Sequence, residues 1–281
     1  MTPFGPLLLA GGGHSHALLL KRWAMRPQLR PDRRIVLVNR TGSALYSGMV
    51  PALIAGIDTT AAVSIDLRQL CDRAGVAFIQ AEITGLDPSR QQLQLKDRPP
   101  LHYGLLSLDV GAISRPTAAA GTPIKPLEPA LAFLADQDPD SAVPFRVVGA
   151  GSAGVEVVLA LRHRWPNRPL QLQGRPGTPA TLEQRMLLHA GIELVDSSDI
   201  SPGPRLLCTG SRAPTWLETS GLPVDRDGRV RTTGTLQVEG HDDLFAAGDC
   251  AVLSDAPRPA SGVWAVRAAG PLARNLEAHS R

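Results

Sequence analysis

Short apolar runs that end in glycine-rich turns mark the first part of the chain. Residues 7–10 are wholly apolar, residues 11–16 read Gly-Gly-Gly-His-Ser-His, and an apolar stretch resumes at residue 17. The first run predicts a buried strand, and the stretch after the turn predicts a helix. This order is the setting of the dinucleotide-binding fingerprint, in which amides at a helix N-terminus hold a pyrophosphate.

The same order recurs in the middle of the chain. Residues 145–148 form a second strand-like run, residues 149–154 are a complete Gly-x-Gly-x-x-Gly, and an apolar helical stretch follows. The first copy departs from this pattern, because His16 stands where the third glycine is expected. Two copies in one setting argue against coincidental glycine turns, so the pattern predicts a duplicated mononucleotide-binding fold.

A second pair of landmarks supports the duplication. A strand-like run leads to Gly111 in the first half and to Gly210 in the second, and each is followed closely by arginine and proline. Gly149 and Gly210 lie 39 residues closer together than Gly11 and Gly111 do. The second half is therefore expected to be a shortened copy of the first.

Polar residues at the ends of the predicted strands are candidate cofactor contacts. Asn39 and Arg40 stand where such folds usually carry an acid that holds a ribose hydroxyl, and Gln173 stands there in the second half. Arg175 could meet a 2′-phosphate, which favours NADPH slightly. Asp249 follows an apolar run, which puts a carboxylate at the ligand-binding edge of the sheet; its alternative role is that of a turn aspartate.

Composition and charge exclude several classes of protein. The 281 residues are 43% hydrophobic and 20% charged, and no stretch approaches the roughly 18 apolar residues of a transmembrane helix. The N-terminus has no basic region before its apolar run, so no signal peptide is expected. The net charge is only +3, and the 26 arginines and 3 lysines are scattered, which argues against a nucleic-acid-binding face.

The cysteines narrow the chemistry further. Cys71, Cys208 and Cys250 are far apart, and no Cys-x-x-Cys is present. This usage is typical of a reducing cytoplasm and argues against a disulfide scaffold, a zinc site or a redox-active dithiol. His14 and His16 are two positions apart and do not share a helix face, so no metal site is expected.

Taken in order, five motifs resemble those of the flavoprotein family that includes pyridine nucleotide–disulfide oxidoreductases and type II NADH dehydrogenases. They are residues 11–16, 109–111, 149–154, 209–211 and 247–249. The resemblance implies an α/β fold with two Rossmann-like, FAD- and NAD(P)-binding, three-layer domains, the second inserted in the first. It implies an FAD-binding domain formed by residues 1–115 and 235–281, and a shortened NAD(P)-binding domain at 116–234.

The resemblance also implies which residues contact the cofactors, with Asp249 at the ribityl or pyrophosphate region and Glu156 at the nicotinamide end. The residues implied for FAD are Gly11, Gly13, His14, Ser15, His16, Asn39, Arg40, Gly111, Asp249, Ala265 and Val266. The residues implied for NAD(P)H as co-substrate are Gly149, Gly151, Ser152, Gly154, Glu156, Gln173 and Gly210.

Two parts of the family pattern are not expected in this chain. The β-meander of the second half would fall between residues 199 and 205, where almost no residues are available. The family's C-terminal interface domain, which often mediates dimers or membrane contact, has no room after residue 277. A membrane-bound quinone role would therefore lack its usual support.

The activity implied is that of a cytoplasmic oxidoreductase that passes a hydride from NAD(P)H to flavin and electrons to an unidentified acceptor. No side chain is clearly needed as an acid or base, so no catalytic residue is singled out. The alternatives are a flavin-binding redox or partner-binding module with a degenerate nicotinamide site, and a non-catalytic protein. More narrowly, residues 11–16, 46–51 and 262–267 are similar to the module found fused to selenide, water dikinase, which implies a partner in selenium metabolism; no dikinase segment is present.

Overall fold

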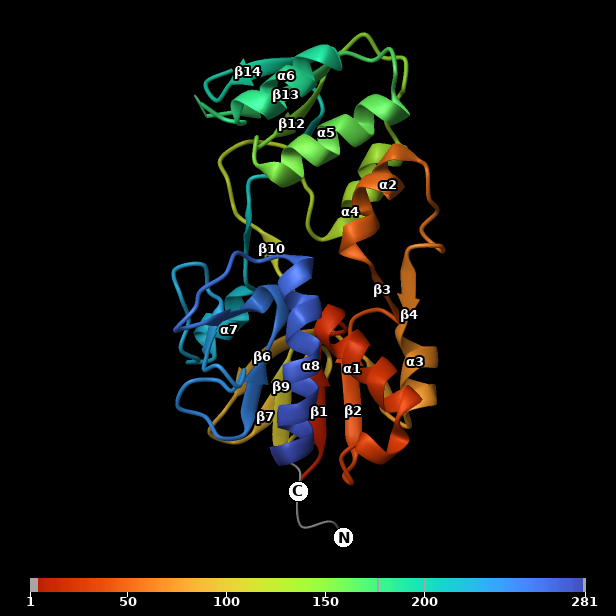
Figure 1. The fold of residues 1–281 in the computed structure, drawn as a ribbon. Coiled ribbons are helices and arrows are strands. Elements are labelled where there is room, and N and C mark those ends of the chain that lie inside the picture. The colour runs from red at the N-terminus through yellow and green to blue at the C-terminus, as the bar shows by residue number, and fades with distance from the viewer. Residues whose placement is uncertain (1–4, 176, 200, 280–281) are drawn as a thin grey trace. The chain divides into compact units, whose positions relative to one another are not determined.

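The structure is a computed structural model that describes residues 5–175, 177–199 and 201–279. The chain forms two compact units (Figure 1). The first comprises Met1–Tyr46, Ser64–Ala112 and Arg212–Arg281, and the second comprises Ser47–Val63 and Ile113–Ser211.

The boundaries of these units differ from the predicted domains at two longer segments and at residues 113–115, which lie in the second unit. Residues 47–63 belong to the second unit, because α2 (Val50–Ala55) packs against α5 (Ser152–Arg164). Residues 212–234 belong to the first unit, because α7 (Thr215–Thr219) packs against the strand at residues 83–87. The pattern of apolar residues located the elements but not the unit to which each one docks.

The first unit is built on a five-stranded parallel sheet. In spatial order its strands are β18 (Leu244–Ala246), β9 (Leu105–Leu108), β1 (Leu7–Ala10), β2 (Ile35–Asn39) and β5 (Ala77–Gln80). Every residue of β1 and β9 is buried, as expected for central strands whose two faces are both covered. The three helices that cover one face are α1 (His14–Met25), α3 (Leu67–Ala74) and α8 (Gly262–His279).

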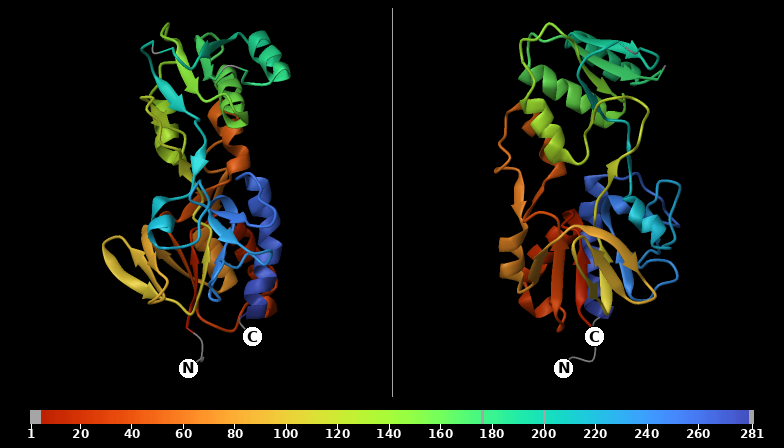
Figure 2. Two further views of the ribbon diagram at one scale, coloured as in Figure 1. Left: turned by 90° about the vertical axis from the view of Figure 1, so that its left-hand side faces the viewer. Right: turned by 180° about the vertical axis from the view of Figure 1, so that it is seen from behind.

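The opposite face of this sheet carries a β-meander, which Figures 1 and 2 show on the side away from α1 and α8. The meander strands are β6 (Ile83–Asp87), β7 (Gln92–Leu95) and β8 (Arg98–His102). The shorter elements of the unit are β3 (Ser43–Leu45), β4 (Ser64–Asp66), β17 (Val230–Thr232), β19 (Ala251–Leu253) and the 3₁₀ turns Pro27–Leu29 and Gly248–Cys250. The first unit therefore has three layers: helices, parallel sheet and meander.

The second unit repeats the order of four of the five strands of the first; the remaining strand, at one edge of the sheet, comes before the fingerprint strand in the chain, whereas in the first unit it comes after all the others. Its parallel sheet runs β11 (Thr122–Pro123), β15 (Arg205–Leu207), β12 (Phe145–Val148), β13 (Leu170–Gly174) and β14 (Ile192–Asp196). Its helices are α2, α4 (Leu127–Ala135), α5 and α6 (Thr181–His189). The remaining elements are the 3₁₀ turn Ser47–Met49 and the two-residue strands β10 (Ile113–Ser114) and β16 (Ser211–Arg212), which pair with each other. The prediction of two Rossmann-like units is confirmed.

The meander of the first unit has no counterpart among the described residues between β14 and β15. Apolar residues of this second sheet pack with the helices on one face only. Arg146, Gln171 and Glu193 stand opposite one another on β12, β13 and β14, so their side chains share the other face. The strands of the first sheet carry apolar residues on both faces, and this polar row accounts for the absence of a meander layer over the second.

Arg146 is the buried member of this row and holds the chain that crosses it. Its guanidinium donates to the side-chain oxygen of Gln171 at 2.7 and 3.0 Å and to the backbone carbonyl of Asp199 at 2.9 Å. It also forms an ion pair with the Asp199 carboxylate at 3.2 Å. One arginine thus links the sheet to the short segment that replaces the meander.

Replacing Arg146 with leucine is expected to lower the free energy of unfolding of the second unit by about 2–3 kcal/mol. The change leaves the Gln171 side-chain oxygen without its donor and removes one of the two side-chain donors to the Asp199 carbonyl, of which the other is the Gln173 amide. Urea denaturation followed by the fluorescence of the buried Trp165 measures the effect. The matched control is Glu193→Gln at the exposed end of the row, which should shift stability by no more than about 0.5 kcal/mol; equal effects of the two variants would contradict the assignment.

Candidate functional sites

The first candidate site lies where β1, β2 and β9 of the first unit end. Gly11 has φ +91°, and a Cβ there would lie 2.4 Å from the carbonyl oxygen of Asp109. The backbone N–H of Gly11 donates to Val38 at 2.8 Å, and that of Gly13 donates to Asp109 at 3.1 Å. Only glycine can adopt this left-handed backbone and leave room for the Asp109 carbonyl. The two backbone hydrogen bonds hold the loop across the carboxyl ends of the three strands.

His16, which replaces the third glycine, lies inside the unit. Its ring is fully buried, with Nδ1 2.7 Å from the carbonyl of Gly11 and Nε2 2.8 Å from the hydroxyl of Ser107. Because a carbonyl only accepts, the proton is on Nδ1, and Ser107 donates to Nε2. Burial lowers the pKa of His16 to about 4, so the ring is neutral. His16 therefore fills the space under the glycine loop with a satisfied polar side chain, and its imidazole faces inward.

Asp109 is a residue of this site that the sequence analysis did not single out. It is buried, and its carboxylate accepts from the backbone N–H of His16 at 3.0 Å and from the N-terminal turn of α1 at Ser15. Cβ atoms placed on Gly13 or Gly248 would come within 2.2 Å of this carboxylate. The signal available in the sequence was an acid directly before Val110 and Gly111, at the end of an apolar strand.

The remaining candidates of the first unit surround the same helix N-terminus. Asn39 accepts from the N–H of Gly12 at 2.9 Å and donates to the carbonyl of Thr41, so its amide fixes the loop rather than standing open for a ribose. The Ser15 hydroxyl donates to the carbonyl of Ala265 at 2.8 Å and links α1 to α8. The structure thus brings together the ends of β2 and α8 at the glycine loop.

The other predicted FAD contacts are more open to solvent. Val266 and Arg40 are exposed, and Asp249 is half-buried in the turn after β18. Gly111 has φ +70°, and no atom lies within 4 Å of a Cβ placed on it. The ring of His14 contacts that of Tyr46 at 5.2 Å between centroids. These residues leave accessible surface around a fixed glycine loop.

The second candidate site lies at the carboxyl ends of β12, β13 and β15. Gly149 has φ +113°, and a Cβ on Gly154 would lie 1.8 Å from the Gly149 carbonyl oxygen, so α5 starts in direct contact with the loop. Nothing lies within 4 Å of a Cβ placed on Gly151, and no side chain caps α5. Ser152 and Glu156 are exposed on the first turns of this helix.

Gln173 is buried and committed to the backbone of the segment that follows β14. Its amide nitrogen lies 3.0, 3.2 and 2.8 Å from the carbonyls of Asp196, Ser197 and Asp199. Arg175 is exposed one residue beyond β13. Gly210 is also exposed, with φ +91°. The position that usually carries a ribose-binding acid therefore holds a structural amide.

Both glycine loops fit the pyrophosphate of a dinucleotide. Each precedes a helix of at least twelve residues whose N-cap residue is a glycine. The first N–H groups of α5 remain available to an anion, whereas at α1 Asp109 already accepts from His16 and Ser15, so an anion there shares the helix N-terminus with this carboxyl group. At the second loop, the space over Gly151 is open. At the first, Gly13 and His14 are half-exposed. FAD on the first unit and a nicotinamide dinucleotide on the second match these donor sets.

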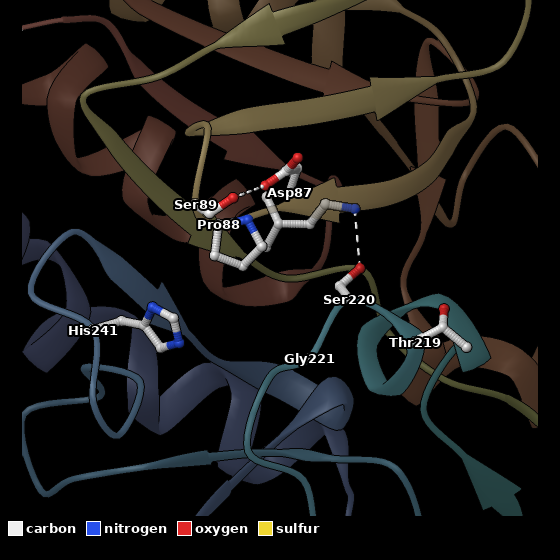
Figure 3. Close-up of a pocket in the computed structure, with 8 residues that line it drawn as sticks. Asp87, Pro88, Ser89, Thr219, Ser220, Gly221 and His241 are labelled. Atoms are coloured by element: carbon white, nitrogen blue, oxygen red, sulfur yellow. Dashed lines mark hydrogen bonds between the residues drawn. The ribbon is translucent and has the colours of Figure 1, made fainter.

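A separate open cavity of about 650 Å³ lies elsewhere in the first unit (Figure 3). It lies between the turn after β6, the end of α7 and the loop carrying His241. Ser89 donates to Asp87 at 2.7 Å, and the N–H of Leu86 donates to Ser220 at 3.0 Å across it. None of its lining residues belongs to a glycine loop.

The thiols take no part in either site as nucleophiles. Cys71, Cys208 and Cys250 are free and buried, and burial raises the pKa of each to about 12. They are therefore protonated at physiological pH. Within residues 5–175, 177–199 and 201–279, no group of three potential metal ligands gathers, and no helix is long and apolar enough to cross a membrane.

Several known proteins are similar to this chain in sequence, although no protein-family model matches it. It is 26% identical over 285 residues to ferroptosis suppressor protein 1 of Taeniopygia guttata, covering 87% of this chain and 72% of that protein. It is 25% identical over 288 residues to demethylphylloquinone reductase NdbB of Synechocystis sp. (87% and 70% covered). It is 24% identical over 280 residues to NADH dehydrogenase-like protein YutJ of Bacillus subtilis (89% and 78% covered).

Solved structures share the fold of the whole chain. Putidaredoxin reductase, in its covalent complex with putidaredoxin, matches with a TM-score of 0.82 at 17% identity over 98% of this chain and 75% of that one. NADH:rubredoxin oxidoreductase of Clostridium acetobutylicum matches with a TM-score of 0.80 at 16% identity over 99% and 76%. These likenesses confirm the predicted fold class.

Proposed function

We propose that this chain binds FAD on the first unit and NAD(P)H on the second, and that it passes a hydride from the nicotinamide to the flavin and electrons to an acceptor. Its sequence relatives and structural neighbours are FAD-dependent oxidoreductases of pyridine nucleotides, NADH dehydrogenase-like. The observation that carries the proposal is the pair of helices whose N-cap residues are glycines, each behind a glycine loop with left-handed backbone at its first glycine. Flavin supplies the redox chemistry, because no thiol of the chain is reactive.

The residues of the chain then have binding and orienting roles. Gly11 and Gly13 let a pyrophosphate approach the N-terminus of α1, and Gly149 and Gly151 do the same at α5. Asp249 has a half-buried carboxylate able to accept from sugar hydroxyls. His16, Asn39 and Gln173 are proposed to support their loops from within each unit, because their side chains are already bonded there. The other predicted contacts keep the cofactor-binding roles given to them by sequence.

The coenzyme is proposed to bind without a carboxylate on its adenosine ribose. Gln173 uses its amide N–H groups inside the unit, and Arg175 is the exposed cation nearest to the end of β13 in sequence. A guanidinium attracts a 2′-phosphate, which supports a preference for NADPH. The alternative, a flavin-binding module with a degenerate nicotinamide site, is favoured by the missing meander of this unit.

The visible spectrum of the purified protein tests the proposal. We expect flavin absorption that bleaches under anaerobic conditions when NADH or NADPH is added, with NADPH effective at the lower concentration. A yellow protein that neither nucleotide bleaches would favour the alternative. A colourless protein that cannot be loaded with FAD would leave only a non-catalytic role.

We also propose a partner in selenium metabolism and a cytoplasmic location, which rest on the sequence. Of the three motifs similar to the dikinase-fused module, residues 11–16 contact the other two: His14 contacts Tyr46, and Ser15 bonds to Ala265. These contacts support a shared role for the three motifs. Comigration of the chain with purified selenide, water dikinase on size-exclusion chromatography tests the partner, and independent elution of the two proteins would count against it.

A further inference from the structure

The two glycine loops are built alike but rest on different side chains. In the first unit the N–H of Asp109 donates to Ala10 at 2.8 Å, and in the second the N–H of Cys208 donates to Val148 at 2.7 Å. Both residues directly follow the strand next to the fingerprint strand, so Asp109 and Cys208 occupy equivalent positions. The second loop therefore rests on a neutral thiol, whereas the first rests on a carboxyl group.

The carboxyl group of Asp109 sits at the inner side of the helix that would receive a pyrophosphate. It is buried against Gly13 and Gly248 and accepts from the first turn of α1. Within the described part of the chain it has no ion-pair partner. An ionised carboxylate here would share the helix N-terminus with the negative charge of the cofactor.

The groups that face Asp109 from neighbouring elements supply no positive charge. They are the backbone of His16 on α1, whose ring is the nearest titratable group of that helix, the carboxylate of Asp249 and the thiol of Cys250. His16 has a pKa of about 4 and Cys250 one of about 12, so both are neutral between these values. Asp249 acts on Asp109 as a like charge. A bound pyrophosphate would add a further negative charge to the same site.

We propose that Asp109 binds a proton when FAD binds, so that the first unit takes up one proton from solution together with its cofactor. The inference rests on the proposed function, because it assumes FAD on this unit. Two negative charges close together in a buried site strongly disfavour each other, so the Asp109 carboxylate is expected to bind a proton when the pyrophosphate is present. The protonated carboxyl group can also donate a hydrogen bond.

The titration of Asp109 without cofactor sets the pH range. Burial, which is the main cause, raises its pKa to about 7, with a smaller contribution from Asp249. Below this pH the carboxyl group is already protonated, and FAD binds without proton uptake. Above it, the affinity for FAD should fall by up to about tenfold per pH unit until the pKa of the complex is reached.

Titration of the apoprotein with FAD, followed by flavin fluorescence from about pH 6 to about pH 9, tests the inference. Calorimetry in two buffers with different ionisation enthalpies counts the protons taken up. We expect uptake approaching one proton above pH 7 in the wild type. Asp109→Asn keeps the shape and removes the charge, so its affinity should no longer fall with pH. Asp249→Asn is the matched control: its affinity can change, but the pH dependence should remain.

The outcomes separate this inference from the proposed function. A wild type that binds FAD with constant affinity across the range, or that releases protons, overturns the inference and leaves the function standing. A pH dependence that persists in Asp109→Asn also overturns it. A wild type that binds no FAD at any pH overturns both. If Asp109→Asn does not fold, the calorimetric proton count on the wild type still decides the question.

Discussion

Replacing Gly154 with alanine is expected to raise the NAD(P)H concentration needed to bleach the flavin by about tenfold to a hundredfold, while the flavin remains bound. The added methyl group would lie 1.8 Å from the carbonyl oxygen of Gly149, so α5 must move away from its loop. Forcing an atom into a packed contact of this kind costs about 1–3 kcal/mol. The affinity for the nicotinamide dinucleotide should fall about tenfold to a hundredfold, because its helix N-terminus is displaced. Anaerobic titration of the flavin spectrum with NADH and NADPH measures the loss.

The matched control lies three residues earlier in the same loop. Gly151 has φ −77°, and a Cβ placed there meets nothing within 4 Å. Gly151→Ala should therefore leave the thermal unfolding temperature unchanged. Any loss of nucleotide affinity in this variant would come from contact between the added methyl group and the bound phosphate, and not from displacement of α5. Unchanged coenzyme affinity in Gly154→Ala, with native unfolding, would show that the second loop does not bind the nucleotide.

The sequence alone predicted that the strand, glycine turn and helix arrangement occurs twice in the fold. Apolar runs followed by glycine turns located β1 and β12, and the same pattern located the strands leading to Gly111 and Gly210. These features are local, because strand burial and left-handed glycines leave their mark on neighbouring residues. The missing meander was also foreseen, because chain length alone excludes three strands between residues 199 and 205.

The unit against which a helix packs, and whether a polar side chain points into the unit or toward the ligand site, could not be derived in this way. α2 belongs to the second unit because it packs on α5, a contact between residues about a hundred positions apart in the chain. Asn39 and Gln173 stand at the predicted strand ends, yet their amides are held by backbone groups of their own unit. Asp109 belongs to the motif at residues 109–111, but its burial against Gly13 follows only from the packing of the unit. Position along a strand predicts that a side chain reaches the site, and only packing decides which way it turns.

Restoring the missing third glycine is expected to damage the first unit. In the second unit Gly154 is required because a side chain would strike the loop, whereas at the corresponding position of the first unit the imidazole of His16 bonds to Gly11 and Ser107. Replacing His16 with alanine leaves a cavity and two buried polar groups without partners, which should cost about 3 kcal/mol. His16→Gly should cost about 1 kcal/mol more, because glycine is the poorer helix former.

Urea denaturation of the apoprotein, together with its affinity for FAD, measures the effect of these changes. Ser107→Ala alone should cost less than His16→Ala, because only one partner of the ring is lost. The double variant His16→Ala/Ser107→Ala should be less unstable than the sum of the single variants, since the orphaned hydroxyl is then gone. Full additivity, or a His16→Gly variant as stable as the wild type, would show that the hydrogen bonds of His16 do not stabilise the loop. The stability of the first glycine loop therefore depends on the hydrogen bonds of His16, and a closer match to the fingerprint sequence would lower it.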